Sequence, residues 1–179
     1  SYWVVGYQNG LELNAGTSAT GTALISNGFA EIRNLAGGGS GTDTLTGQNV
    51  QSTWLVSSTG ESYLDESTNE TLSYASFENL TGGTEKDDFI VMAAHTGSLS
   101  GGGGGDVIDI QSGGVVNGDL FGNSGNDEIF IATDASVTGM IQGNDGDDLV
   151  SVNFTGLQAR AFQVNVGTGD DELRLTGGE

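Results

Sequence analysis

One pattern occurs three times in register: HTGSLSGGGGGD (95–106), VNGDLFGNSGND (116–127) and VTGMIQGNDGDD (137–148). Each follows the frame x-x-Gly-x-φ-x-Gly-x-x-Gly-x-Asp, where φ is apolar, and the closing aspartates are 21 residues apart. A fixed period of about twenty residues is typical of a solenoid, in which each repeat buries its apolar face by stacking on its neighbours. The sequence therefore predicts coils of about 21 residues.

Weaker copies of this frame lie on both sides. GGGSGTDTL (37–45) and GGTEKDDFI (82–90) precede the three strong copies, and VGTGDDELRL (166–175) follows them. The successive key aspartates are 44, 19, 21, 21 and 23 residues apart. The first step equals two coils of 22 residues, which predicts an intermediate turn near Tyr63-Leu64-Asp65.

A second, longer sequence repeat divides the N-terminal half of the chain into two related parts. AEIRNLAGG (30–38) matches ASFENLTGG (75–83), and Tyr2-Trp3 matches Thr53-Trp54. We therefore predict one solenoid domain over residues 1–179. Within it, residues 1–50 and 51–93 are two related two-coil repeats, 94–175 are regular single-coil repeats, and 176–179 begin a further repeat. With no initiating Met, the sequence has the character of a piece of a longer protein.

Short runs that alternate at period two follow each aspartate, which indicates half-buried β-strands. The residues expected to face inward are Phe89 and Val91, Ile108 and Ile110, Ile129 and Ile131, Val150 and Val152, and Leu173 and Leu175. A second strand with Leu99, Leu120, Ile141 and Val164 precedes the next turn. Helical spacing is absent, and the lack of Pro suits a continuous hydrogen-bond ladder. The expected fold class is all-β, a parallel β-solenoid.

The composition excludes several classes of protein. The net charge of −20 leaves only Arg33, Lys86, Arg160 and Arg174 to contact phosphates, so nucleic acid is not an expected partner. There is no Cys, hence no disulfide framework and no thiolate metal site. The sequence contains no apolar run long enough to span a membrane and no signal-peptide pattern.

The acidic turns suggest a ligand. Coils of a parallel solenoid stack at roughly 4.8 Å, so Asp106, Asp127, Asp148 and Asp171 should form a column of carboxylates. Neighbouring charges at that distance repel by about 3–4 kcal/mol at an effective dielectric constant of about 20. A divalent cation held by carboxylates and backbone carbonyls would reverse that repulsion, and oxygen-only ligation favours Ca²⁺. The alternative is that Gly-Asn-Asp segments are simply good turn formers.

At Gly38–Leu45 and Gly101–Ile108 the chain resembles the calcium-binding nonapeptide G-G-x-G-x-D-x-U-x of RTX proteins. Segments such as FENLTGG also resemble those of large repetitive bacterial surface adhesins. The family's β-rolls carry two nonapeptides on each coil, whereas this chain has one, so an ion column should lie along one edge only. The turn at 82–87 departs most, with Glu85 and Lys86 in place of Gly.

This resemblance implies Ca²⁺ held between successive turns, in a protein that is secreted or displayed on the bacterial cell surface. Carried over position by position, it implies a calcium site built from Asp43, Asp87, Asp106, Asp127, Asp148 and Asp171 together with the turn glycines Gly41, Gly104, Gly125, Gly146 and Gly169.

Other residues fit packing roles. His95 is the only His, and we expect it in a turn or the core rather than in catalysis. Trp3 and Trp54 are expected in the core or a cap, with sugar stacking as the alternative. Phe154 and Phe162 are expected in the solenoid interior, and Asn34 and Asn79 could begin an Asn ladder.

Three functions remain open. The leading hypothesis is a structural repeat module of a secreted adhesin or extracellular filament, rigidified by Ca²⁺ and not an enzyme. The second is a binding module that contacts surface glycans or further copies of itself end to end. The third is a β-helix polysaccharide lyase or epimerase, which needs cationic groups to neutralise a uronate and a base to take the proton. Four scattered cations and one His in a chain of net charge −20 argue against it. Membrane insertion is not expected.

Overall fold

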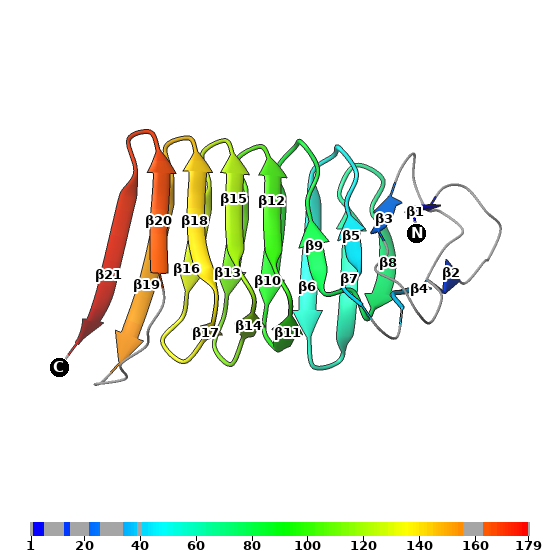
Figure 1. Ribbon diagram of the computed structural model, residues 1–179, viewed down its shortest axis with the longest axis horizontal. Helices are drawn as coiled ribbons and strands as arrows, with labels where there is room; N and C mark the ends of the chain where they lie inside the picture. Colours follow the sequence, from blue (N-terminus) through cyan, green and yellow to red (C-terminus); the bar gives the residue numbers. More distant parts are fainter. Residues whose placement is uncertain are drawn as a thin grey trace.

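In the computed structural model the chain forms a stack of β-coils, elongated along one axis (Figure 1). The structure describes residues 2–5, 13–14, 22–25, 34–38, 41–155 and 163–178. The two ends of the chain lie at opposite ends of the stack (Figure 1). The predicted all-β, parallel solenoid with coils of about 21 residues is confirmed.

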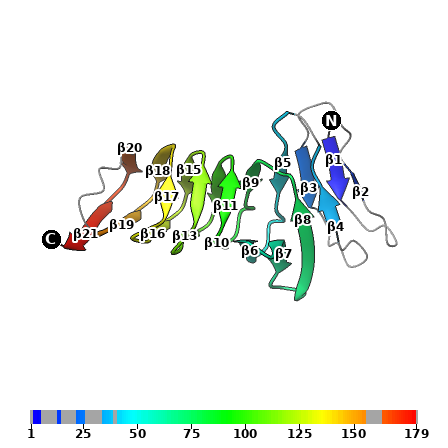
Figure 2. The same cartoon turned by 90° about the horizontal axis from the view of Figure 1, so that it is seen from below.

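Two large sheets run along the whole stack, as Figure 2 shows from a second side. The first sheet contains, in spatial order, β1 (Tyr2–Val5), β3 (Thr22–Ile25), β5 (Thr44–Thr46), β9 (Asn79–Thr81), β12 (Leu99–Gly103), β15 (Leu120–Ser124), β18 (Met140–Asp145) and β20 (Gln163–Thr168). All its neighbouring strands are parallel.

The second sheet contains β2 (Leu13–Asn14), β4 (Asn34–Ala36), β8 (Glu70–Ala75), β7 (Gly60–Asp65), β6 (Ser52–Ser57), β10 (Asp87–Val91), β13 (Val107–Ile110), β16 (Glu128–Ile131), β19 (Leu149–Thr155) and β21 (Glu172–Gly178). A short third sheet contains β11 (Ala94–Thr96), β14 (Val115–Asn117) and β17 (Ser136–Val137). One coil therefore passes from the first sheet through an aspartate turn to the second sheet, and returns through the third.

The core consists of straight columns of apolar side chains, because each strand lies in register on its neighbour. One column of the second sheet joins Phe89, Ile108, Ile129, Val150 and Leu173, and the next joins Val91, Ile110, Ile131, Val152 and Leu175. In the first sheet the column is Leu45, Leu80, Leu99, Leu120, Ile141 and Val164. Apart from Val164 and the two leucines of β21, all of these side chains are buried. The predicted alternation is thus confirmed.

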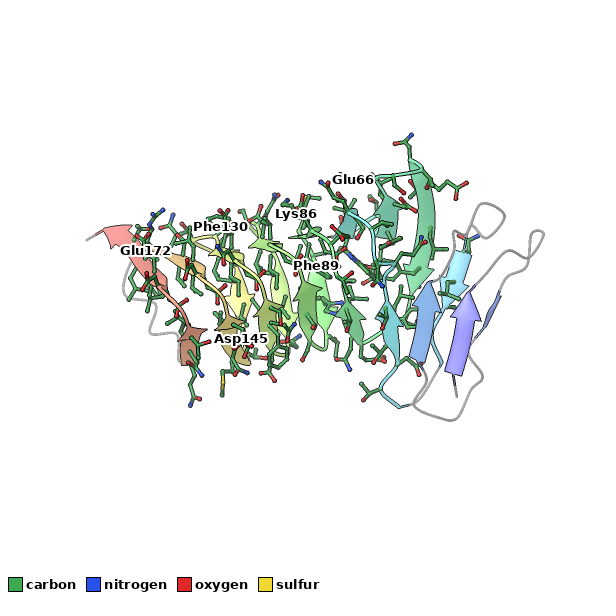
Figure 3. The ribbon with its side chains drawn as sticks, turned by 90° about the horizontal axis from the view of Figure 1, so that it is seen from above. Glu66, Lys86, Phe89, Phe130, Asp145 and Glu172 are labelled. Carbon is green, nitrogen blue, oxygen red and sulfur yellow. The ribbon has the colours of Figure 1, made fainter. Side chains whose placement is uncertain are left out.

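Side chains between these positions face outward. Figure 3 shows Phe89 between the two large sheets, whereas Phe130 and Glu172 lie on the outer side of the second sheet. Phe130 follows buried Ile129 and precedes buried Ile131, as a period of two requires.

The predicted turn near Tyr63-Leu64-Asp65 is wrong. These residues lie inside β7, which pairs antiparallel with both β6 and β8. The 44-residue step between the first two key aspartates thus contains a three-stranded antiparallel meander inserted into the second sheet, and not two regular coils. The meander packs on the solenoid through Trp54, which stacks on Phe89 at 5.3 Å and meets Tyr63 and Tyr74 edge-on.

The long sequence echo does not place its copies in equivalent positions. Asn34–Ala36 forms β4 of the second sheet, whereas its echo Asn79–Thr81 forms β9 of the first. Asn34 pairs with Ser73 and Asn79 with Thr44, so these two residues do not form the suggested Asn ladder. The same turn-and-strand sequence therefore fits either corner of the coil.

Every regular element in the described part of the chain is a strand, and accordingly no helix there is suited to crossing a membrane. The side chains of Trp3, Arg33, Arg160 and Phe162 lie outside the described residues.

Candidate functional site: the aspartate column

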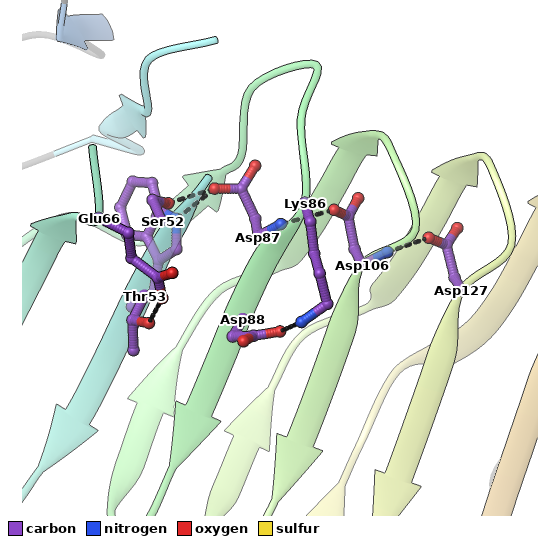
Figure 4. Close-up of polar contacts among 9 residues, drawn as sticks. Ser52, Thr53, Glu66, Lys86, Asp87, Asp88, Asp106 and Asp127 are labelled. Atoms are coloured by element: carbon purple, nitrogen blue, oxygen red, sulfur yellow. Dashed lines mark hydrogen bonds and ion pairs between the residues drawn. The ribbon is translucent and has the colours of Figure 1, made fainter. Parts of the chain in front are cut away.

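Five key aspartates lie in one column at the corner where the first sheet leads into the second. They are Asp87, Asp106, Asp127, Asp148 and Asp171, and the backbone N–H of each of the first four donates to Oδ1 of the aspartate in the next coil. Figure 4 shows this ladder from Asp87 to Asp127. The N···O distances are 2.8 Å for Asp87 to Asp106, 2.8 Å for Asp106 to Asp127, 2.8 Å for Asp127 to Asp148 and 3.0 Å for Asp148 to Asp171. The predicted column of Asp106, Asp127, Asp148 and Asp171 is therefore present, and Asp87 extends it by one coil.

The first four carboxylates of this column are inside the molecule, whereas Asp171 is half-buried. Asp87, Asp106, Asp127 and Asp148 are 0%, 1%, 1% and 3% exposed. At Asp106, Asp127 and Asp148 the second oxygen, Oδ2, is buried and accepts no hydrogen bond from the described residues. A buried charge without a partner is costly, so a proton or a bound cation would stabilise each of these three aspartates, which we call the unsatisfied rungs of the column.

Burial raises the pKa of Asp106 to about 7 and that of Asp87 and Asp127 to about 6, and it also raises the pKa of Asp148. The neighbouring carboxylates add repulsion, whereas the donated N–H bonds act in the opposite direction. The side chain of Lys86, the cation next to the column in sequence, forms an ion pair with Asp88.

The predicted turn glycines take the backbone conformation that the turn requires. Gly104, Gly125 and Gly146 have φ of +122°, +120° and +141°, and Gly41 and Gly169 are also positive, at +112° and +141°. Where Asn123 and Asn144 replace the second glycine of the nonapeptide, they adopt φ near +80°. Asn tolerates the left-handed region better than other residues with a side chain, so the turn keeps its shape.

The glycine five residues before each aspartate was missed as a part of the site. A Cβ atom on Gly101, Gly122 or Gly143 would lie 2.2–2.3 Å from Oδ2 of Asp106, Asp127 or Asp148. At Gly122 the same atom would lie 2.7 Å from the carbonyl oxygen of Gly143 in the next coil. The carboxylate therefore occupies the space of a side chain, and only glycine leaves room for it. The signal was in the frame, which repeats glycine at this position.

The column ends in different ways at its two ends. At the N-terminal end the position before Asp87 is Ser52, whose hydroxyl donates to Asp87 Oδ1. Trp54 Nε1 lies 3.4 Å from the same oxygen, and Gly83 N–H donates to Oδ2 at 2.7 Å. Asp87 is thus satisfied on both oxygens. At the other end, Asp171 accepts from Asp148 and belongs to the last described coil.

The prediction that Asp43 belongs to this column is wrong. Asp43 precedes β5 of the first sheet, so it lies at the opposite corner of the coil. There it accepts from Gly38 N–H, and its own N–H donates to Glu78 Oε2 at 2.7 Å. At this corner the backbone N–H groups of Glu78 and Asn79 donate to the carbonyl oxygen of Asp43. The neighbour of Asp43 in the next coil is therefore Glu78 and not Asp87.

A second, exposed ladder follows the outside of the same turns. Asp147 N–H donates to Asn126 Oδ1 at 3.0 Å, and Asp170 N–H donates to Asp147 Oδ1 at 2.8 Å. Asp145 also accepts from the hydroxyl of Thr168. These side chains hold successive turns together while remaining hydrated.

Calcium can be tested against this donor set. Each of the three unsatisfied rungs offers one carboxylate oxygen, and at Gly122 a carbonyl oxygen of the next coil approaches the same point. Oxygen donors of this kind are those that Ca²⁺ prefers. No group of three or more His, Cys, Asp or Glu side chains that could hold a metal ion occurs in the described ranges. Calcium here would therefore take most of its ligands from backbone carbonyls and water.

His95 and Trp54 are core residues, as the sequence suggested. His95 is 2% exposed, its Nε2 lies 3.0 Å from Glu78 O, and its Nδ1 lies 3.7 Å from Glu61 of the meander. Trp54 is fully buried, which leaves no face on which a sugar could stack.

Comparison with known proteins adds no assignment: the chain matches no family model, no curated protein and no solved structure.

Proposed function

We propose that this chain is a structural repeat module of a secreted bacterial adhesin or extracellular filament, stiffened by Ca²⁺ along the aspartate column. The observation that carries the proposal is the buried, unpartnered Oδ2 of Asp106, Asp127 and Asp148. Bound calcium would supply the positive charge that these rungs lack. The parallel ladder runs along the whole first sheet and, in the second sheet, from β6 to β21. These ladders support a rod whose contribution is reach and stiffness.

A non-catalytic role is part of the proposal. The single histidine is buried and occupied by the Glu78 carbonyl and Glu61. The charged pairs Lys86–Asp88 and Arg174–Glu172 leave no described cation free to neutralise a uronate substrate.

Calcium is expected to raise the melting temperature of the protein. With a dissociation constant near 10⁻³ M, as in extracellular modules, about 5 mM Ca²⁺ contributes about 1 kcal/mol for each occupied rung. The measurement is thermal melting by circular dichroism in Ca²⁺ and in EDTA, with Mg²⁺ as a second cation.

Two variants with equal charge separate column binding from general screening. Asp127→Asn removes one unsatisfied rung and should lose part of the calcium-dependent gain. Asp134→Asn lies off the column, where Asp134 is exposed and accepts from Ser112, and should keep the full gain. Equal melts of the wild-type protein in Ca²⁺ and EDTA would reject the calcium role, as would an equal loss in both variants.

A further inference from the structure

Three segments of the chain have the sequence Asn-x-Thr, which is the acceptor sequence for N-linked glycosylation of exported proteins. They are Asn69-Glu70-Thr71, Asn79-Leu80-Thr81 and Asn153-Phe154-Thr155. All three asparagines belong to the described part of the chain, so their surroundings can be compared. A folded protein accepts a sugar where the side-chain amide is exposed, has no other partner and lies where the backbone bends.

Asn69 is the last residue of the turn between β7 and β8, and its side chain is exposed. Ser67 and Thr68 before it and Thr71 after it are exposed as well. Within the described part of the chain, the side-chain amide of Asn69 forms no hydrogen bond. Glu66, from the same turn, lies on the outer side of the second sheet (Figure 3). An enzyme can therefore reach the amide of Asn69 from solvent.

The backbone of this turn is held by Asp65 and does not need the asparagine side chain. Asp65 Oδ1 accepts from the N–H of Ser67 at 2.8 Å and from the N–H of Thr68 at 3.1 Å. The N–H of Asn69 donates to the carbonyl oxygen of Asp65 at 2.8 Å. Asn69 has φ of +58°, which Asn tolerates and Gly adopts without steric cost. This conformation explains an Asn or a Gly here, but it does not require Thr71, which completes the acceptor sequence.

Asn79 is unsuited as an acceptor because its amide is used inside the first sheet. The side chain is half-buried, and its Oδ1 accepts from the N–H of Ser98 in the next coil at 3.0 Å. The whole segment Asn79–Thr81 forms β9, which pairs with β5 on one side and β12 on the other. This segment would have to leave the sheet to enter an enzyme.

Asn153 is exposed, but its backbone is fixed within a strand. It lies in β19, and its partner in the ladder is Thr176 of β21. The same ladder continues through Thr155, so the whole acceptor segment is extended and paired. Such a segment cannot bend into an active site without breaking the ladder, whereas the segment at Asn69 begins in a turn.

We propose that Asn69 is an N-glycosylation site and that the protein carries a sugar there. The donor class is a sugar activated by a nucleoside diphosphate. Nδ2 of Asn69 forms a bond to the anomeric carbon of the sugar, and the bond from that carbon to the diphosphate oxygen breaks. The nucleoside diphosphate leaves, and the amide gives up one proton to a base of the transferase. The inference rests on the export of the chain that is part of the proposed function, and it is independent of calcium.

Peptide mapping by mass spectrometry of the protein isolated from its native source tests the proposal directly. The peptide that contains Asn69 should carry a sugar on this residue, and Asn79 and Asn153 should be unmodified. An unmodified Asn69, or a sugar on either of the other two residues, would overturn the proposal. Melting of the same protein in Ca²⁺ and in EDTA is a separate measurement, so a failure of one proposal can be told from a failure of the other.

A transfer assay measures whether the fold selects this site. The folded chain is incubated with UDP-glucose and an N-glycosyltransferase that recognises Asn-x-Thr, and synthetic peptides of the three segments serve as the unfolded control. All three peptides should accept glucose, whereas the folded chain should accept one glucose, at Asn69. Equal transfer to Asn69 and Asn153 in the folded chain would contradict the selection, as would a folded chain that takes up no glucose.

Three variants separate glycosylation from turn formation. Asn69→Gly suits φ of +58°, and Thr71→Val keeps a β-branched side chain on β8 without the hydroxyl group. Both should melt like the wild type and take up no glucose. Thr71→Ser keeps the hydroxyl group and should still be modified at Asn69. Transfer to Asn69 that persists in Thr71→Val would show that the segment is not recognised as an acceptor, and the proposal would fall.

Discussion

Gly125→Ala is expected to prevent the solenoid from folding stably. A Cβ atom at this position would lie 1.3 Å from the carbonyl oxygen of Gly104 in the preceding coil. It would also force a side chain onto φ of +120°. Neither coil can move away, because β15 before the turn and β16 after it are each paired in register with a strand on both sides. The expected loss is above about 5 kcal/mol, which is comparable with the whole stability of a domain.

Gly113→Ala is the matched control. Gly113 also has positive φ, +81°, but a Cβ atom there would meet no atom within 4 Å. We expect a cost of only about 1–2 kcal/mol, from the left-handed conformation alone. Urea denaturation followed by circular dichroism measures both losses. If the two variants unfolded at similar urea concentrations, the close stacking of turns at Gly125 would be wrong.

The period of the sequence predicted most of this fold because a solenoid converts spacing directly into register. Aspartates 21 residues apart became neighbours in adjacent coils, and Ile108, Ile129 and Val150 became a buried column. Once one coil is known, the position of the next follows from the repeat alone.

The meander could not be derived in this way. Its strands alternate at period two, and that pattern is the same for parallel and antiparallel pairing. The available signals were local: Thr59-Gly60 and Asn69 mark the two tight turns on either side of the six-residue strand β7. In the structure φ is +138° at Gly60 and +58° at Asn69. Asp43 was misplaced for a related reason, since a Gly-rich turn followed by an alternating strand fits both corners of the coil.

The sequence did not indicate the environment of the column. The repeat placed Asp127 and its equivalents in one column but gave no sign that their carboxylates are buried. In the structure each carboxylate turns inward beneath its own glycine and accepts a backbone N–H of the preceding coil. The direction of a side chain at a turn depends on which neighbouring residues lack a Cβ atom, and spacing alone does not give it. The result is a ladder that stabilises register while it buries charge.

Without calcium, we expect the protein to be more stable at about pH 5 than at about pH 8. In the folded state the carboxyl groups of Asp106 and Asp127, with pKa values of about 7 and about 6, are protonated at the lower pH. In the unfolded chain they return to their ordinary pKa near 4 and are ionised at both pH values. The folded state therefore binds more protons in this range, and stability falls as the pH rises through the folded-state pKa values.

The effect should be on the order of 1–2 kcal/mol: Asp106 and Asp127 lose their protons between pH 5 and pH 8, a tenfold change in proton affinity corresponds to about 1.4 kcal/mol, and solvent screening reduces the full value. The groups of the column are coupled, so the total is smaller than the sum over rungs. Asp65, whose pKa is lowered by hydrogen bonds from Ser67 and Thr68, has the opposite pH dependence, but that dependence lies below its ordinary pKa and outside this range. The measurement is the free energy of unfolding in urea and EDTA at several pH values.

Asp127→Asn separates the column from the general repulsion of an acidic protein. The amide oxygen can still accept the N–H of Asp106, and the side chain no longer titrates, so the difference in stability between the two pH values should shrink. Asp134→Asn removes the same charge from an exposed site and should leave that difference nearly as large as in the wild type. Two results would show that the buried carboxyl groups do not hold protons. One is a wild-type stability that rises with pH, and the other is the same difference in stability between the two pH values in both variants. In that case the unpartnered oxygens would have to be satisfied by some other donor.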